Sequence, residues 1–324
     1  MKIVGCTAAR VARDAINLIN VNRSHAVPLI RAEIPLREAP HPQNGAPPLS
    51  GAFAAVWPQE WAFLRSPAAD GATNMAVDAV LLALAGEGHR AVWRCYAWDE
   101  PTLSFGRNET TRDRFSAAGL MHAGLRAVRR PTGGRALLHA REVTYSVTMP
   151  LPQQHAWRTA YAAVNSVLLQ ALQSLGVPAE LVAAPDAPPI APDGPLCFDQ
   201  PAAGEITVHG RKLVGSAVWR HGGAYLQHGS ILLSDDQSRL TQAADRALPP
   251  SPPAATLEAC APAHASWSSV VDALERALTR SVATASPRPT SNHPIVPFAP
   301  PADFAARVAE QRDHFADAKW LWRR

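Results

Sequence analysis

Apolar residues recur at helical spacing in two stretches of the chain. In residues 70–84 they repeat every three or four positions, which predicts a helix with Thr73 as its N-terminal cap. Residues 155–177 carry a longer stripe, and Gly176 with Pro178 ends this second predicted helix. The stripe positions are Met75, Val77, Leu81, Leu82 and Leu84 in the first helix and Tyr161, Val164, Leu168, Leu172 and Leu175 in the second.

Strand-like patterns lie between and after these helices. Residues 142–149 alternate apolar and hydroxyl side chains with a period of two, which is typical of a strand. Further β-like runs cover residues 91–98, 102–106, 125–130 and 224–234, and shorter helices are expected near 110–120, 267–281 and 302–316. The strands are grouped rather than in strict β–α–β alternation. The predicted fold class is therefore α+β, with a mixed, largely antiparallel sheet flanked by helices.

Proline clusters suggest how the chain is divided. The chain has 30 prolines in 324 residues, and they gather in a few segments rather than spreading evenly. We expect a poorly ordered extension over residues 1–55 and a catalytic domain over 56–248. Residues 249–324 are expected to form a C-terminal helical extension with proline-rich linkers.

Composition narrows the functional classes. The net charge is +4 and the arginines are scattered along the sequence, so a nucleic-acid-binding surface is not indicated. The small excess of positive charge would suit an acidic protein partner. No apolar run approaches the roughly 20 residues that span a bilayer. The four cysteines show no paired spacing, which favours neither disulfides nor a zinc site. We expect a cytoplasmic enzyme.

Lys212 is unusual because the chain otherwise avoids lysine. Of 31 basic residues only Lys2, Lys212 and Lys319 are lysines, and two of them lie near the termini. Arginine does not lose its proton in proteins, whereas a buried lysine can exchange one. The pattern favours a chemical role for Lys212, and a chance lysine on a hairpin is the alternative.

Two loops carry further candidate chemistry. Residues 128–139 hold Gly133 and Gly134 among Arg129, Arg130 and Arg135, which suits a phosphate or a polarised carbonyl but equally a tight turn. Cys197 lies in a proline-rich loop about fifteen residues before Lys212. A cation stabilises a thiolate, and the hairpin could bring this lysine back to the sulfur; an inert cysteine is the other reading.

The hairpin that turns at His209–Gly210 sets the expected faces. Strand alternation puts Lys212, Val214 and Ser216 on one face and Gly215 with Ala217 on the other, where their small side chains leave room for a slim ligand. His139 and His228 could each contribute to a site or be ordinary hydrogen-bonded histidines.

Together these segments resemble the lipoate/biotin protein ligase superfamily over about residues 60–245. The matching elements are ATNMAVDAVLLAL, RRPTGGRALLHAREVTYSV and GRKLVGSAVWRHGGAYLQHGSILL. The similarity is greatest to the cysteine-dependent octanoyltransferases of the LipM type, because LCFDQP is present and Arg135 stands where ATP-using ligases tend to have a third glycine. Val218–Trp219 and the AAGE sequence depart from the usual pattern.

The resemblance implies a biotin/lipoate protein ligase-like catalytic domain that moves an octanoyl group from acyl carrier protein to a lysine of a lipoyl domain, such as glycine cleavage H protein. It implies that Cys197 forms an acyl-enzyme thioester and that Lys212 stabilises the thiolate and later accepts a proton. Leu137 and Val214 are expected to line the acyl slot. The expected substrate-binding residues are Arg130, Gly133, Gly134, Arg135, His139, Gly215, Ser216 and His228.

No metal, ATP or other cofactor is expected, since a thioester is already activated. The implied partners are the two proteins of the transfer, with neither nucleic acid nor membrane, and the enzyme is expected to be a monomer. The alternatives are an ATP-dependent lipoate–protein ligase, an amidotransferase between two lipoyl domains, and a binding module that has lost catalysis.

Overall fold

The fold is that of a computed structural model. It describes residues 53, 55–111, 114–153, 156–183, 196–198, 201–248, 252–285 and 295–323. All of them belong to the compact unit Asn44–Arg324. The predicted extension over residues 1–55 lies almost wholly outside the described residues. The predicted boundary near residue 249 stays a prediction.

Two sheets form the framework. In the described part of the chain the larger sheet has eight strands in the order β11-β1-β2-β6-β10-β9-β8-β7, and five of its seven pairings are antiparallel. In that order the strands are β11 (Ile295–Pro297), β1 (Trp61–Arg65), β2 (Ala91–Tyr96), β6 (Glu142–Pro150), β10 (Ala224–Leu232), β9 (Arg211–His221), β8 (Ile206–Val208) and β7 (Glu180–Leu181). The smaller sheet consists of β4 (Arg126–Arg129), β3 (Thr102–Phe105) and β5 (Leu137–His139).

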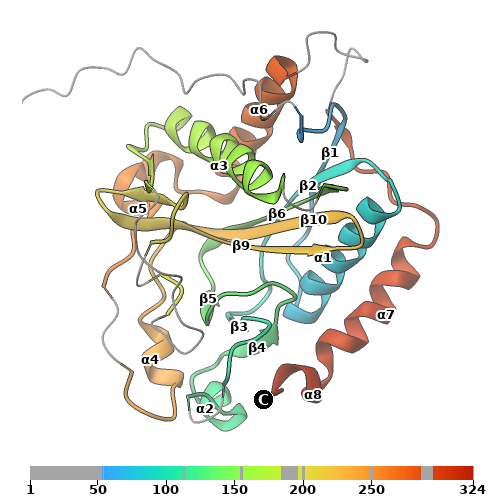
Figure 1. Ribbon diagram of the computed structural model, residues 1–324. Helices are drawn as coiled ribbons and strands as arrows, with labels where there is room; N and C mark the ends of the chain where they lie inside the picture. Colours follow the sequence, from blue (N-terminus) through green and yellow to red (C-terminus); the bar gives the residue numbers. More distant parts are fainter. Residues whose placement is uncertain are drawn as a thin grey trace, which may run out of the picture. The chain divides into compact units, whose positions relative to one another are not determined.

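Helices cover both faces of the larger sheet (Figure 1). Their bounds are α1 (Gly71–Gly86), α2 (Ala117–His122), α3 (Trp157–Ser174), α4 (Arg239–Ala243), α5 (Leu257–Cys260), α6 (Trp267–Ala285), α7 (Phe304–Ala316) and α8 (Ala318–Leu321). α3 and α6 pack on one face and share the main apolar core with it. α1 and the smaller sheet lie on the other face, and α7 runs along α1. The predicted α+β class and largely antiparallel sheet are confirmed.

The helix starts differ from the sequence-based expectation. α1 is capped by Asp70, whose carboxylate accepts hydrogen bonds from the Thr73 backbone N–H (2.8 Å) and hydroxyl (3.0 Å), so the prediction that Thr73 itself is the cap was wrong. The short helix expected near residues 110–120 begins later, at Ala117, where Ser116 caps it. The long apolar stripe of α3 is buried as predicted, apart from the half-buried Tyr161.

A bulge in the hairpin changes which side chains share a face. The turn lies at His209–Gly210 as predicted, with positive φ at both residues. Thr207 pairs with Lys212, and the residue before it, Ile206, pairs with Val214. Leu213 therefore has no partner on β8 and is an extra residue on β9.

The extra residue reverses the alternation on one side of the bulge. Leu213 and Val214 both enter the core beneath α3, whereas Lys212 turns to the opposite face and lies beside Gly215. The prediction that Lys212 shares a face with Val214 and Ser216 was therefore wrong. Val214 also does not line the pocket described below, contrary to expectation.

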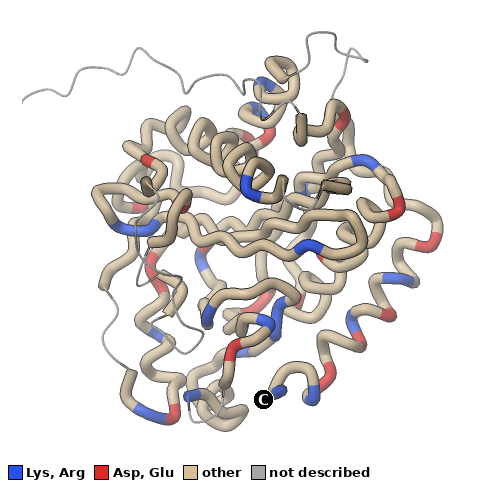
Figure 2. Tube along the Cα trace, viewed as in Figure 1, with Lys and Arg blue, Asp and Glu red and all other residues tan. Residues whose placement is uncertain are grey.

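Charge is distributed without a single-sign stripe along the described trace. Figure 2 shows basic and acidic residues interspersed, and on α7 both signs occur along one helix. Two α7 arginines contact α1 through ion pairs, Arg307 with Glu87 and Arg312 with Asp70. Within the described residues, no helix is long and apolar enough to cross a bilayer.

Candidate active site

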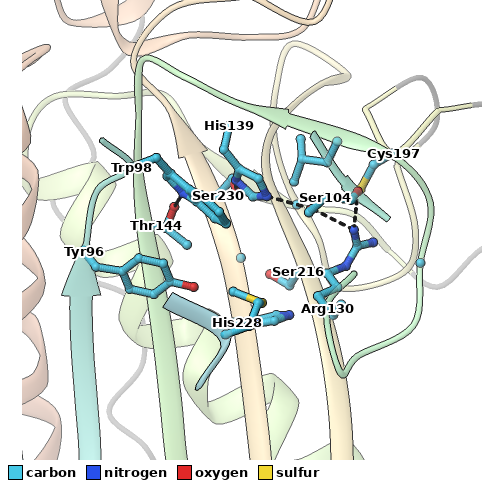
Figure 3. A pocket seen from close by; sticks show the side chains of 16 residues that line it. Tyr96, Trp98, Ser104, Arg130, His139, Thr144, Cys197, Ser216, His228 and Ser230 are labelled. Atoms are coloured by element: carbon cyan, nitrogen blue, oxygen red, sulfur yellow. Dashed lines mark hydrogen bonds between the residues drawn. The ribbon is translucent and has the colours of Figure 1, made fainter. Parts of the chain in front are cut away.

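A pocket lies between the α1 face of the larger sheet and the smaller sheet (Figure 3). It contains about 430 Å³ of space between atoms, its open mouth included, and the surface facing it is mainly apolar. Three of the ten predicted site residues, Gly133, Arg135 and Lys212, are outside its lining. The other seven line it: Arg130, Gly134, His139, Cys197, Gly215, Ser216 and His228.

Cys197 and Lys212 meet at the edge of this pocket. Cys197 is half-buried, and its Sγ lies 4.0 Å from Lys212 Nζ. The Lys212 ammonium also donates to the Cys197 carbonyl oxygen at 2.7 Å and pairs with Glu205 Oε1 at 2.7 Å. The ammonium therefore lies directly behind the sulfur, between the Cys197 backbone and a buried carboxylate.

The Arg130 guanidinium organises the glycine loop. It donates to the Gly133 carbonyl (3.1 Å), to the Arg135 carbonyl (2.8 Å) and to both oxygens of Ser104 (2.9 Å each). Burial lowers the pKa of Arg130, and negative charge at Cys197 opposes that shift. Arg130 thus holds the loop closed and also adds positive potential near the sulfur.

Gly134 is required by the shape of this loop. Its φ is +89°, and a Cβ added there would lie 2.6 Å from Arg130 Nη2. Its carbonyl oxygen lies against Gly106, where an added Cβ would be only 1.9 Å away. A Cβ on Gly133 would meet no atom within 4 Å. Of the two glycines, Gly134 carries the conformational requirement.

His139 belongs to a buried hydrogen-bond chain that lines the pocket. Its Nδ1 is 2.7 Å from Glu142 Oε1, and its Nε2 is 2.8 Å from Ser104 Oγ, which in turn accepts from Arg130 (Figure 3). The imidazole stacks on Trp98 with ring centroids 4.0 Å apart. These hydrogen bonds fix the plane of the His139 imidazole and the position of the Arg130 guanidinium.

His228 is anchored on the other side of the pocket. Its Nε2 is 2.6 Å from Thr132 Oγ1, in the glycine loop, and its Nδ1 is 3.1 Å from Asp78 Oδ2, on α1. Burial lowers the pKa of His228, although the hydrogen bond to Asp78 works in the opposite direction. Neutral His228 therefore ties the loop to α1.

A buried ion pair supports this anchor. Burial disfavours ionised Asp78, but Arg94 and the hydrogen bond from His228 hold the Asp78 pKa below its usual value. Arg94 Nη1 lies 2.7 Å from Asp78 Oδ1, and both side chains are almost completely buried. Asp78 is thus a fixed anion in the middle of α1.

The remaining predicted residues have other positions. Ser216 lines the pocket, and its hydroxyl pairs with Tyr145 Oη at 2.7 Å, on the face opposite Lys212. Gly215 lies against Lys212 and Phe198: an added Cβ would be 3.1 Å from Lys212 Cε. Arg135 is buried next to the loop.

Several residues of the site were not predicted from the sequence. Glu205 is the last residue of the AAGE sequence, and it was not chosen as a site residue. Ser104 and Asp78 reach the site by long-range contacts that local patterns do not reveal, whereas Glu142 contacts His139 three residues before it. No group of three or more potential metal ligands occurs in the part of the chain that the structure describes.

The chain matches a known catalytic-domain model and known enzymes. The lipoyl protein ligase A/B catalytic domain matches residues 70–285. Octanoyltransferase LipM of Kyrpidia tusciae is 42% identical over 190 residues, which cover 56% of this chain and 69% of that protein. Octanoyltransferase LipM of Carboxydothermus hydrogenoformans is 36% identical over 186 residues, covering 56% and 68%.

Solved structures share the fold. A lipoate-protein ligase A bound with ATP superposes with a TM-score of 0.63 at 17% identity, covering 81% of this chain and 98% of that one. A bi-partite lipoate protein ligase from Thermoplasma acidophilum gives 0.62 at 17% identity, covering 81% and 96%. At such low identity these structures show the fold alone.

Proposed function

The chain belongs to the lipoyl protein ligase A/B catalytic-domain family, and from this membership and its similarity to octanoyltransferases we infer that it is an acyltransferase that transfers octanoyl groups in protein lipoylation. The observation that carries the mechanism is the 4.0 Å approach of Cys197 Sγ to Lys212 Nζ at the edge of a mainly apolar pocket. A thiolate beside an ammonium is the nucleophile best suited to a thioester.

In the first half of the proposed reaction, Cys197 takes the acyl group from the donor. The Cys197 thiolate attacks the donor's thioester carbonyl, the bond from that carbonyl to the donor sulfur breaks, and octanoyl remains as a thioester on Cys197. The departing donor thiolate takes a proton from the Lys212 ammonium. Since the thioester supplies the activation, this step needs no ATP.

In the second half, the lysine amine of the acceptor attacks the Cys197 thioester. Carbon–nitrogen bond formation makes the amine acidic, and neutral Lys212 accepts its proton. The Cys197–acyl bond breaks, and the thiolate is restored beside the ammonium. Lys212 therefore acts first as acid and then as base, and the enzyme returns to its starting charge state.

The pocket supports both halves. The backbone at Gly133–Gly134 is our candidate for binding the developing oxyanion; one such donor typically contributes roughly 3–4 kcal/mol. Leu137, Gly215 and Ala217 offer apolar surface to the acyl chain. His139 and His228 have their ring nitrogens engaged by protein groups, so we assign them to shaping the pocket rather than to proton transfer.

The partners follow from the chemistry. An acyl donor and a lipoyl-domain acceptor are implied by the transferase function. Octanoyl–acyl carrier protein as the donor, and glycine cleavage H protein as an example of the acceptor, are our finer proposals. A cytoplasmic location is also a proposal: among the described residues Cys95, Cys197 and Cys260 are unpaired, which suits a reducing compartment. A monomeric state is testable by sedimentation.

Intact mass spectrometry tests the proposed function. Incubation with octanoyl–acyl carrier protein should add one octanoyl group that hydroxylamine removes, and peptide mapping should place it on Cys197. Cys197→Ala should abolish the adduct and the transfer to a lipoyl domain, with or without ATP. Full activity of this variant with ATP and free lipoate would instead identify an ATP-dependent ligase. A lipoyl domain charged with octanoyl is the second donor to try, since it distinguishes an amidotransferase.

A further inference from the structure

Glu205 is a buried carboxylate in direct contact with Lys212. It lies just before β8, its side chain is 5% exposed, and its Oε1 is 2.7 Å from Lys212 Nζ. We propose that Glu205 is a positioning residue for acyl transfer: its carboxylate is the counter-charge of the Lys212 ammonium and directs one ammonium N–H toward Cys197. The proposal rests on the acyl-transfer function above.

The three N–H donors of the Lys212 ammonium explain how one of them is directed toward Cys197. An ammonium has three N–H bonds in a tetrahedral arrangement. Among the described residues, Glu205 Oε1 takes one at 2.7 Å and the Cys197 carbonyl oxygen takes another at 2.7 Å. The third remains for Cys197 Sγ, at 4.0 Å. Two short contacts therefore direct the remaining N–H toward the Cys197 sulfur, beside which the donor thiolate leaves the carbonyl carbon.

Glu205 is itself held rigidly. Its Oε2 accepts from the Ala202 backbone N–H at 2.7 Å, and its own N–H donates to the Ala202 carbonyl at 3.0 Å. Its carbonyl accepts from Val182 N–H at 2.9 Å, and the Gly204 carbonyl before it accepts from the Asn165 amide at 2.7 Å. The carboxylate is therefore fixed before the ammonium reaches it.

Because Lys212 is buried, its ammonium needs the negative charge of Glu205 next to it. Only 3% of the Lys212 side chain is exposed, and burial without a counter-charge favours the neutral amine. A neutral amine does not stabilise the Cys197 thiolate and has no proton to give to the departing donor thiolate. The adjacent carboxylate compensates the ammonium in the resting state. After Lys212 has given up its proton, the same carboxylate favours its return from the acceptor amine.

The hairpin register explains how the pair forms. Thr207 pairs with Lys212, and Glu205 lies two residues before Thr207, so its side chain is on the same face of β8. The bulge at Leu213 turns Lys212 and Gly215 to one face, and the missing Cβ at Gly215 leaves space for the lysine stem. Regular pairing would separate Lys212 from Gly215.

Glu205→Gln tests the charge with little change of shape. The readout is the rate at which iodoacetamide alkylates the peptide that contains Cys197, measured from pH 5.5 to 9. An ordinary thiol is only about 1% ionised at pH 6.5. The rate of the Gln variant at pH 6.5 should therefore fall at least about tenfold below that of the wild type, whereas the rates converge at high pH. Glu180→Gln, on exposed β7 beside the same hairpin, is the matched control and should match the wild type.

A second variant, alone and combined with Glu205→Gln, tests whether Glu205 acts through Lys212. Lys212→Met should lower alkylation at pH 6.5 as Glu205→Gln does, and the double variant should be no lower than Lys212→Met alone. Octanoyl transfer by Glu205→Gln should fall roughly 100-fold, in the range of a lost acid–base group. Lost transfer with an unchanged alkylation profile would overturn the proposal, as would a further drop in the double variant.

The alkylation readout needs no acyl donor, so it separates this proposal from the proposed function. If the wild type fails to transfer octanoyl but Glu205→Gln still shifts the profile, the function is wrong and the charge coupling is right. If Glu205→Gln does not fold, the alkylation rate of Glu205→Asp tests the proposal instead. It retracts the carboxylate by one methylene, so its rate at pH 6.5 should lie between those of the wild type and Lys212→Met. A rate equal to that of the wild type would overturn the proposal.

Discussion

Lys212→Arg separates the charge of Lys212 from its proton transfer. Arginine keeps a positive charge next to Glu205 and Cys197, but it does not accept a proton because it is never deprotonated in proteins. The proposed first half-reaction depends mainly on the cation, since a thiolate leaves without much help from an acid. The second half-reaction depends on a base for the attacking amine. The substitution should therefore slow the two halves unequally.

The magnitude follows from the chemistry and the narrow site. A positioned acid–base group contributes about 10²–10⁴-fold, which is roughly 3–5 kcal/mol at 1.36 kcal/mol per tenfold. The lysine stem passes a slot where a Cβ on Gly215 would lie 3.1 Å from its Cε and 3.3 Å from the Phe198 ring. We expect turnover to fall at least about 100-fold.

Single-turnover mass spectrometry measures the two halves separately. Lys212→Arg should still form the octanoyl adduct on Cys197, and the adduct should accumulate because its transfer to the lipoyl domain is slow. Lys212→Met is the companion variant: without a cation it should form the adduct slowly as well. Turnover of the Arg variant within tenfold of the wild type, or rapid discharge of its adduct, would refute the role of Lys212 as a base.

Three further predictions concern the scaffold around the pocket. Gly134→Ala should lower the free energy of unfolding by at least about 1–2 kcal/mol in a denaturant titration, because φ is +89° and the new Cβ meets a guanidinium, whereas Gly133→Ala should have little effect. Arg94→Met should cost about 3–5 kcal/mol in the same titration, because it leaves the Asp78 carboxylate buried without its partner; an unchanged midpoint would contradict this. Because burial lowers the pKa of His228, this histidine binds a proton at a higher pH in the unfolded chain than in the folded one. Its contribution to the free energy of unfolding is therefore present above pH 6.5 and is lost as pH falls below it. His228→Gln should flatten the melting temperature against pH between 7 and 5, and an unchanged slope would count against this assignment.

Sequence patterns predicted the parts of the fold that depend on local periodicity. The stripe of α3 and the turn at His209–Gly210 were both read from residues close together in the chain. The contact between Cys197 and Lys212 was also expected, because a hairpin returns the chain toward the preceding loop. These features need only short-range rules of helix and turn geometry.

The faces of β9 could not be predicted in the same way. The alternation rule assumes regular pairing, and the extra Leu213 arises from how β8 and β9 align, which no single residue signals. The cap of α1 was misplaced for a related reason. Asp70 and Thr73 are both good capping residues, and only the backbone entry into the helix selects Asp70.

The carboxylates of the site were missed because their burial and their partners are set by strand pairing and tertiary packing. Glu205 precedes an ordinary short strand, and its importance comes from the lysine across the hairpin. Asp78 resembles a polar position within a helix, but the fold buries it against Arg94 and His228. A sequence shows a charge, whereas only the tertiary structure shows whether that charge is buried and by what it is balanced.

The C-terminal helical turn has a consequence for how the enzyme matures. The Arg129 guanidinium, next to the glycine loop, donates to the backbone carbonyls of Trp320 (3.1 Å) and Leu321 (2.9 Å), and the Trp320 indole donates back to the Arg129 carbonyl at 2.9 Å. These residues lie beyond the matched span of 70–285 and are synthesised nearly two hundred positions after the arginine they hold. On the ribosome, the nascent chain can pair β1 to β10 before residues 295–321 are made, but it completes the brace behind the glycine loop only when Trp320 and Leu321 emerge.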